Sequence, residues 1–226
     1  MTPFYNNLWR SHRLILLGGA LLLNVSLGPI SFAQAVPATP PSAKAPVTNS
    51  DCLACHSDSS SAPFVDQDKY KTSVHGKNLC TSCHADLATS DFPHNTPKPV
   101  NCGSCHTQEL AKFSDSLHGR ALASGDKLAP KCSSCHGNHD ILPVKDKNSN
   151  VSAFHVPFVC GSCHSEGKPV SLQREIHEDH ILENYSESIH GEGLLKKGLS
   201  VTATCSSCHL AHQILPHTDP RSSIAR

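Results

Sequence analysis

The hydrophobic residues of this 226-residue chain follow helical spacing over two short stretches, residues 108–118 and 172–190. In the first stretch, one helical face would carry Leu110, Phe113 and Leu117. In the second stretch, one face would carry Leu172, Ile176, Tyr185 and Ile189. Each stretch ends in His-Gly, and glycine is typical of the left-handed residue that closes a helix. We therefore predict short helices that present a histidine at their C-terminal end, beside a residue without a side chain.

A separate apolar run, Leu14–Leu23, follows the basic residues Arg10 and Arg13 and precedes Ala-Gln-Ala at residues 33–35. This order predicts a cleaved export signal over residues 1–35. The alternative is an uncleaved membrane anchor, but the run is shorter than the roughly 20 residues that span a bilayer. Residues 36–50, rich in Pro and Ala, are expected to be a linker. No second apolar segment follows, so no membrane span is expected after cleavage.

The composition predicts a thin core, because only 38% of the residues are hydrophobic and 5% are aromatic. The formal net charge is zero, so nothing favours a nucleic acid or an anionic membrane as partner.

All twelve cysteines lie in six Cys-x-x-Cys-His motifs. The motif cysteines are Cys52, Cys55, Cys80, Cys83, Cys102, Cys105, Cys132, Cys135, Cys160, Cys163, Cys205 and Cys208, and the motif histidines are His56, His84, His106, His136, His164 and His209. This motif attaches c-type haem: the two thiols bind the porphyrin and the histidine binds the iron. Zinc ribbons, thioredoxin-like sites and disulfide frameworks also use paired cysteines, but none requires a histidine after every pair. We therefore expect six covalent haems, which would build the core of a mainly α and irregular fold with little β-structure.

The chain repeats in three units of two motifs each, residues 51–101, 102–159 and 160–217, within a hexahaem domain over residues 51–226. Aromatic-x-x-Ser-x-His-Gly occurs once in each unit, at residues 70–76, 113–119 and 185–191. Cys-Ser-Ser-Cys-His-x-x-His-x-Ile-Leu-Pro occurs twice, at residues 132–143 and 205–216.

The second axial ligand of each iron is expected to be histidine, since the only methionine is Met1 and no cysteine lies outside the motifs. The repeat selects six candidates, His75, His94, His118, His139, His190 and His212. His155 could replace one of them, whereas His177, His180 and His217 are expected to be surface residues. His139 and His212 follow a motif histidine by three residues, too few to carry the chain around a porphyrin. As ligands they would therefore serve a neighbouring haem.

Over about residues 51–214 the sequence resembles the exported multihaem cytochromes c of the doubled-CxxCH, cytochrome c3-like type. The resemblance rests on Ser-x-His-Gly, on Cys-x-x-Cys-His-Gly-Asn-His-Asp-Ile, and on Phe-Pro-His94 ahead of Cys-Gly-Ser-Cys-His. It implies stacked, bis-histidine, low-potential haems. It also implies redox partners such as a quinol oxidoreductase, a terminal reductase or another cytochrome.

These features predict a periplasmic or otherwise exported one-electron relay that is not an enzyme and has no catalytic residues. The alternative is a multihaem reductase of a small oxyanion, which would need one haem with an open coordination position.

Overall fold

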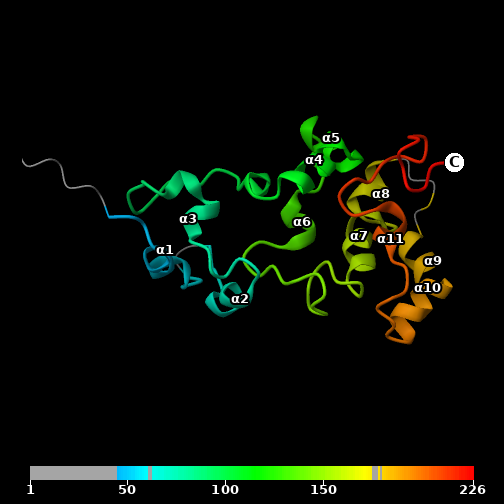
Figure 1. Cartoon of the computed structure of the whole chain (residues 1–226), viewed down its shortest axis with the longest axis horizontal. Coiled ribbons are helices and arrows are strands. Elements are labelled where there is room, and N and C mark those ends of the chain that lie inside the picture. The colour runs from blue at the N-terminus through cyan, green and yellow to red at the C-terminus, as the bar shows by residue number, and fades with distance from the viewer. Residues whose placement is uncertain (1–44, 61–62, 175–177, 179) are drawn as a thin grey trace, which may run out of the picture. The chain divides into compact units, whose positions relative to one another are not determined.

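The computed structural model describes residues 45–60, 63–174, 178 and 180–226 (Figure 1). The predicted signal peptide, most of the predicted linker, Ile176 and His177 lie outside the described residues. Within them the chain forms short helices, turns and loops and no strand, which confirms the mainly α and irregular fold class. In that same part of the chain, no helix is both long and apolar enough to cross a membrane.

The helices are, in chain order, α1 (Asn49–His56), α2 (Gln67–Thr72), α3 (Cys80–Cys83), η1 (Ala85–Leu87), η2 (Cys102–Ser104), α4 (Thr107–Asp115), α5 (Leu117–Ala123), α6 (Cys132–His136), α7 (Val156–His164), α8 (Pro169–Gln173), α9 (Ile181–Glu187), α10 (Ile189–Gly191), η3 (Glu192–Lys196, a π-helical turn) and α11 (Cys205–His209).

The protein buries few apolar side chains of its own. Among the described residues, the buried hydrophobic side chains are Val47, Leu194 and Leu215. Other hydrophobic residues, such as Leu172, Ile189 and Val201, are 72%, 82% and 90% exposed. The thin core predicted from composition is therefore observed, and burial of protein side chains alone contributes little to the stability of this fold.

Three of the six CxxCH motifs begin a short helix whose start is fixed by a local hydrogen bond. The Asn101 side chain accepts a hydrogen bond from the Gly103 amide at the start of η2. In the two Cys-Ser-Ser-Cys-His motifs, the hydroxyls of Ser134 and Ser207 accept hydrogen bonds from the backbone N–H groups of Lys131 and Thr204, both at 3.0 Å. These bonds satisfy backbone groups that a helix start would otherwise leave unpaired.

The predicted helix ends at His-Gly are wrong. Helix α4 ends at Asp115, and Ser116 starts a new helix by accepting a hydrogen bond from the Gly119 amide at 3.0 Å. Ser188 starts α10 in the same way through Gly191, at 3.1 Å. In these two motifs, the histidines His118 and His190 therefore lie in the first turn of a helix, not in the last.

Gly119 and Gly191 are required for a close approach of backbone and not for a left-handed conformation, because neither has a positive φ. A Cβ on Gly119 would lie 1.9 Å from the carbonyl oxygen of Phe113, and a Cβ on Gly191 would lie 2.0 Å from that of Tyr185. A side chain at either position would force the two consecutive helices apart.

The single helix predicted over residues 172–190 is also wrong. Helix α8 ends at Gln173, and α9 begins at Ile181. The apolar residues that suggested one helical face belong to separate segments, and Leu172 and Ile189 are largely exposed.

Two backbone hydrogen bonds join consecutive sequence units at equivalent positions. The amide of Val74 donates to the carbonyl of Ile141 at 2.8 Å, and the amide of Leu117 donates to the carbonyl of Ile214 at 2.9 Å. Each donor is the residue before the Ser-x-His-Gly histidine of one unit. Each acceptor is the isoleucine of Ile-Leu-Pro in the next unit.

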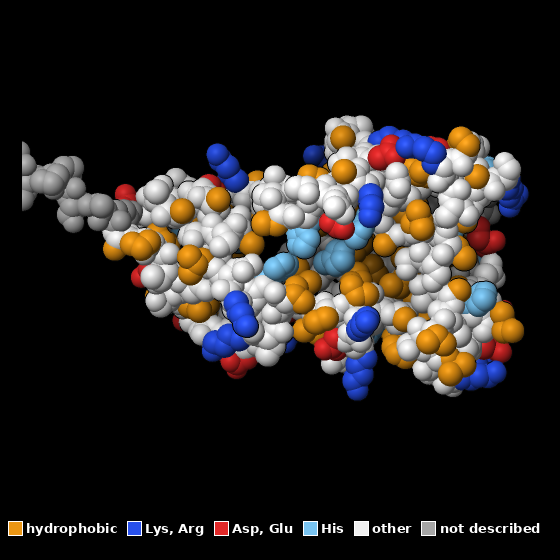
Figure 2. Space-filling view, in the orientation of Figure 1, with side chains coloured by type: hydrophobic (Ala, Val, Ile, Leu, Met, Phe, Trp, Pro, Cys, Tyr) orange, Lys and Arg blue, Asp and Glu red, His pale blue; other side chains and the backbone are white. Residues whose placement is uncertain are grey.

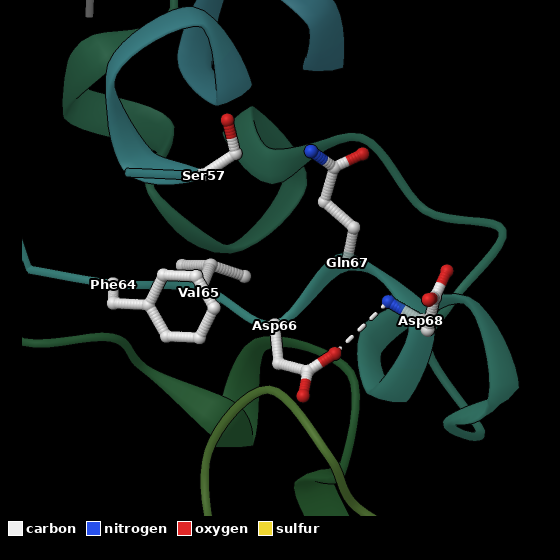
Figure 3. Close-up of a pocket in the computed structure, with 6 residues that line it drawn as sticks. All are labelled: Ser57, Phe64, Val65, Asp66, Gln67 and Asp68. Atoms are coloured by element: carbon white, nitrogen blue, oxygen red, sulfur yellow. Dashed lines mark hydrogen bonds between the residues drawn. The ribbon is translucent and has the colours of Figure 1, made fainter. Parts of the chain in front are cut away.

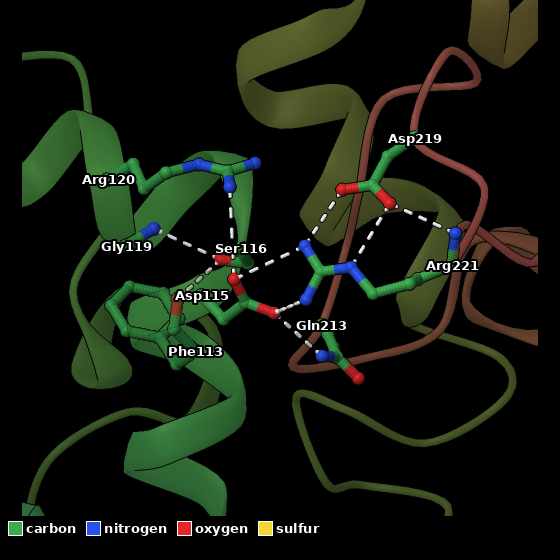
Figure 4. Close-up of polar contacts among 8 residues, drawn as sticks. All are labelled: Phe113, Asp115, Ser116, Gly119, Arg120, Gln213, Asp219 and Arg221. Atoms are coloured by element: carbon green, nitrogen blue, oxygen red, sulfur yellow. Dashed lines mark hydrogen bonds and ion pairs between the residues drawn. The ribbon is translucent and has the colours of Figure 1, made fainter.

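Polar side chains reinforce the contact between the second and third units (Figure 4). Asp115, at the C-terminal end of α4, accepts hydrogen bonds from Gln213 at 2.9 Å and from Arg221 at 2.7 Å. Arg221 also binds Asp219 at 2.8 Å, which holds the guanidinium in place. The Gln213 and Arg221 hydrogen bonds, in that order, lower the pKa of Asp115, and hydrogen bonds from Arg221 lower the pKa of Asp219 to about 2.

Candidate haem-binding sites

Five of the six motif histidines lie beside a histidine from outside the motifs. The ring centres are 5.9 Å apart for His56 and His94, 6.3 Å for His84 and His139, 6.0 Å for His106 and His75, 5.9 Å for His136 and His212, and 6.0 Å for His164 and His118. All five partners belong to the set that the sequence selected as axial ligands. Figure 2 shows histidine side chains around a hollow in the middle of the visible face.

These distances fit two imidazoles on opposite sides of one metal ion. An imidazole nitrogen binds a metal at about 2.0–2.1 Å. Each ring centre lies about 1 Å beyond its nitrogen, so two axial imidazoles on one iron have centres about 6 Å apart. Each motif histidine also follows directly after the second cysteine of its own motif. The donor set therefore fits haem c.

Hydrogen bonds orient both rings of the first pair. Nδ1 of His56 lies 2.7 Å from the carbonyl oxygen of Pro63, and Nδ1 of His94 lies 2.7 Å from that of Asn95. A carbonyl only accepts, so each Nδ1 carries the proton and each Nε2 is left with a free lone pair. Histidine ligands are commonly oriented in this way.

Burial favours the neutral, ligating form of four further histidines. Desolvation is the largest cause that lowers the pKa of His118, His136, His139 and His164, and neighbouring imidazoles lower it further. A neutral imidazole has the lone pair that a metal needs, whereas the protonated ring has none.

The first cysteines of the two motifs in each unit interact with one another. Interactions with Cys52 add to desolvation in raising the pKa of Cys80 to about 11, and Cys132 adds to desolvation in raising that of Cys102. The Cys160 thiol lowers the pKa of Cys205 to about 7 through a side-chain hydrogen bond. All twelve cysteines are free thiols in this structure. The two motifs of a unit therefore lie side by side.

Four of the five histidine pairs join residues of two consecutive units. His139 and His212 meet the second motif histidine of the preceding unit, not the motif next to them. Conversely, His75 and His118 meet the first motif histidine of the following unit. Each junction between consecutive units is thus crossed by one histidine in each direction.

The remaining candidates are not brought into such pairs. Among the described residues, neither His190 nor His209 makes a ring contact with another histidine. Nδ1 of His155 lies 2.8 Å from the carbonyl oxygen of Ser149, and the ring makes no contact with a motif histidine among the described residues. Nδ1 of His180 lies 3.2 Å from a carboxylate oxygen of Glu166, and the side chain of His217 is exposed.

Two surface hollows lie away from most of these residues. One, of about 390 Å³, is lined by residues that include Phe64, Asp66 and Asp68 and by no histidine or cysteine (Figure 3). The other, of about 330 Å³, includes His94. In the described part of the chain, no three His, Cys, Asp or Glu side chains converge as a site for a bare metal ion would require.

Sequence reasoning missed the backbone bonds to Ile141 and Ile214 and the contacts of Asp115. The repeated Ile-Leu-Pro was visible in the sequence and marked the acceptor position. Nothing in the sequence indicated that its carbonyl would bind the residue before a Ser-x-His-Gly histidine.

Comparisons with known proteins agree with this chemistry. Residues 45–89 match the family described as the doubled CXXCH motif. The multiheme cytochrome MtrA of Shewanella baltica (strain OS185) is 26% identical over 160 residues, covering 58% of this chain and 47% of that protein. The chain therefore spans less than half the length of this relative, and no solved structure matches it significantly. Together with the six CxxCH motifs and the helical fold, without strands in the described residues, these matches support a multihaem c-type cytochrome with doubled CxxCH motifs.

Proposed function

We propose that this protein is an exported electron-transfer protein that holds six haems c and ligates their irons with pairs of histidines. The observation that carries the proposal is the set of five imidazole pairs with ring centres 5.9–6.3 Å apart. The ligands we assign are the six motif histidines together with His75, His94, His118, His139 and His212, which complete five of the six sites. His190 is a further candidate ligand, and it pairs with no motif histidine among the described residues. Haem c would supply a one-electron iron couple at each site.

The protein's own residues would fix position and exclude exchangeable ligands. The cysteines would tether each group by two thioethers, and paired imidazoles would occupy both axial positions. A fully ligated iron has no site for a substrate, so one-electron exchange is the chemistry that such an arrangement favours.

The contacts between motifs support a linear order of sites along the sequence. Cysteine contacts link the two motifs within each unit, and crossed histidines link one unit to the next. We propose that electrons enter and leave through redox proteins, such as a quinol oxidoreductase, a terminal reductase or another cytochrome, in the periplasm.

The test is the spectrum of the holoprotein together with its mass. The mass should exceed that of the polypeptide by six haems. At least five irons should be low-spin in the ferric EPR spectrum and should not bind carbon monoxide when reduced. A His94→Ala variant should gain one high-spin iron, whereas His217→Ala, at an exposed histidine, should not. High-spin iron at several sites in the unaltered protein would contradict the proposal.

One observation favours a second candidate, a multihaem reductase of a small oxyanion. His209 meets no second imidazole among the described residues, so its haem could keep an open position. Continuous reduction of nitrite by the holoprotein, with excess reduced viologen as the electron donor and with inhibition by one equivalent of cyanide, would favour this candidate. Stable reduced protein in the presence of nitrite would exclude nitrite as its substrate.

A further inference from the structure

The junction between consecutive units is built twice to one design. A residue before a Ser-x-His-Gly histidine donates its amide to an isoleucine carbonyl of the next unit, as Val74 does to Ile141 and Leu117 does to Ile214. At each junction two imidazole pairs cross, one in each direction: His75 with His106 and His139 with His84, then His118 with His164 and His212 with His136.

The first unit does not need a preceding unit. Its first motif histidine, His56, pairs with His94 of the same unit, where His106 and His164 depend on a histidine from the unit before. The position three residues after His84 is Leu87, so this unit also lacks the histidine that would reach backwards. The first motif histidine of the first unit therefore has its partner within that unit.

The third unit carries the other half of a junction, and no described residue completes it. Ile189 occupies the position of Val74 and Leu117, but among the described residues its amide has no hydrogen-bond acceptor. Its side chain is 82% exposed, against 52% and 44% for Val74 and Leu117. The next residue, His190, has no histidine ring beside it among the described residues, whereas the equivalent His75 and His118 each have one. In the same part of the chain, His209 has no histidine ring beside it, whereas the equivalent His84 and His136 each have one.

The surroundings of Ile189 also match a face that is normally covered. Leu199 and Val201, which follow in the same unit, are 47% and 90% exposed. Figure 2 shows hydrophobic side chains over the region of α9 and α10. Glu187, at the position of Asp115, forms no ion pair in the described part of the chain, whereas Asp115 is held by Gln213 and Arg221 of the following unit.

We propose that this face of the third unit, formed by residues 187–191 and His209, binds a doubled-CxxCH unit of a partner cytochrome. The proposal rests on the proposed haem function. The partner's histidine, three residues after its second motif, would ligate the haem of His209, and His190 would ligate the partner's first haem. The partner's Ile carbonyl would accept from the Ile189 amide.

A second copy of this chain does not fit the role. Its first unit has Leu87 where the donated histidine is needed, and its His56 already pairs with His94. The occupant must carry a doubled-CxxCH unit built like the second and third units, with the sequence Cys-x-x-Cys-His-x-x-His-x-Ile.

The first experiment measures spin state in the holoprotein alone. We expect about one iron in six to be high-spin, to bind carbon monoxide when reduced and to become low-spin with imidazole. His190→Ala should leave this fraction unchanged, whereas His118→Ala, the matched control, should add one high-spin iron. Six low-spin irons at all protein concentrations, with one of them becoming high-spin in His190→Ala, would mean that His190 ligates a haem of its own unit. That result would overturn the proposal.

The second experiment supplies the missing unit. Residues 217–226 occupy the positions of residues 144–153, and Ser222 and Ser149 make equivalent hydrogen bonds to Leu215 and Leu142. A second copy of residues 154–226 appended after Arg226 therefore continues the existing repeat. This eight-haem chain should still have one high-spin iron, in the appended unit, and His190→Ala should now add another.

Two high-spin irons in the extended chain would overturn the docking proposal while leaving the five internal pairs intact. The same conclusion would follow if His190→Ala did not change the number of high-spin irons in the extended chain. Failure of the haem function itself would be seen differently, as a mass short of six haems or as several high-spin irons in the unaltered protein. Six low-spin irons only at concentrations where the holoprotein dimerises would identify a second copy as the occupant and would also overturn it.

Discussion

At the scale of single residues, the backbone of Leu210 is held in a conformation that favours glycine. Leu210 follows the last CxxCH motif with φ 66° and ψ 173°, and Gly137 follows the fourth motif with φ 82° and ψ −167°. A side chain in this region costs about 1–3 kcal/mol. The equivalent turn is therefore relaxed in the second unit and strained in the third.

We predict that Leu210→Gly stabilises the holoprotein by about 1 kcal/mol, because it relieves this strain and loses only a partly exposed side chain. The check is guanidinium unfolding followed through the haem absorbance. Gly137→Leu is the reverse control and should destabilise by about 1–3 kcal/mol. An unchanged midpoint in both variants would show that the turn tolerates either residue.

Gly119 is the second residue whose identity is fixed by space. Because a Cβ would lie 1.9 Å from the Phe113 carbonyl oxygen, Gly119→Ala should displace α5 and move His118 away from His164. We expect a loss of about 1–3 kcal/mol in stability and one additional high-spin iron.

The matched control is Gly125→Ala, where no atom lies within 4 Å of the added Cβ and φ is +83°. It should cost about 1–2 kcal/mol through backbone strain alone and leave the EPR spectrum unchanged. Equal spectra for the two alanine variants would contradict the role assigned to Gly119.

At the scale of helices, the contact between α4 and the C-terminal segment depends on ionised carboxylates. The pKa values of Asp115 and Asp219 are lowered in the folded protein, that of Asp219 to about 2. A lowered pKa contributes stability above the unfolded value near 4, and this contribution is lost as pH falls through the folded value. The side chains of Asp115 and Asp219 are 36% and 17% exposed, so solvent partly screens these interactions and the effect is local.

We therefore expect hydrogen exchange at the Leu117 amide, which bonds Ile214, to accelerate relative to the Val74 amide as pH falls from about 4 to about 2. Asp115→Asn should remove most of this difference. Asp58→Asn is the control, because hydrogen bonds from Ser60 lower the pKa of Asp58 within one loop. Parallel acid profiles for the two amides would refute the prediction.

The helices also show what a single sequence could and could not predict. The six motifs, their histidines and the thin core followed from residue types and spacing. The start of a helix at Ser116 was open to prediction, since serine three residues before the Gly119 amide is an N-cap pattern, but apolar periodicity across Phe113 and Leu117 suggested one continuous helix. Over residues 172–190 the periodicity also failed, because it could not reveal that Ile189 is exposed.

At the scale of the whole described molecule, the order in which histidines meet was only partly predictable. Spacing excluded His139 from its adjacent haem, since three residues cannot reach the opposite face. Choosing His84 as its partner required the tertiary fold. The same holds for His75, whose partner His106 belongs to the next unit.

The crossed pairs predict that removing one such ligand weakens a junction between units. His139→Ala should add one high-spin iron and also increase trypsin cleavage after Lys77, because one of the links between the first two units is lost. His94→Ala, which lies in a pair within the first unit, should add the high-spin iron without loosening the junction. Equal cleavage of the two variants would argue against a structural role for the crossed ligand.

The crossing of His139 to His84 also has a consequence for how the protein is made. In the exported protein that we propose, the motif around Cys80 would emerge from the export channel well before residue 139, so thioether formation there would precede the arrival of its second imidazole. The first unit would remain unfinished during secretion, open to water, oxygen or a stray histidine. A cell that makes this protein would then need to protect each nascent segment until its successor crosses the membrane, and slow translocation would yield misligated product.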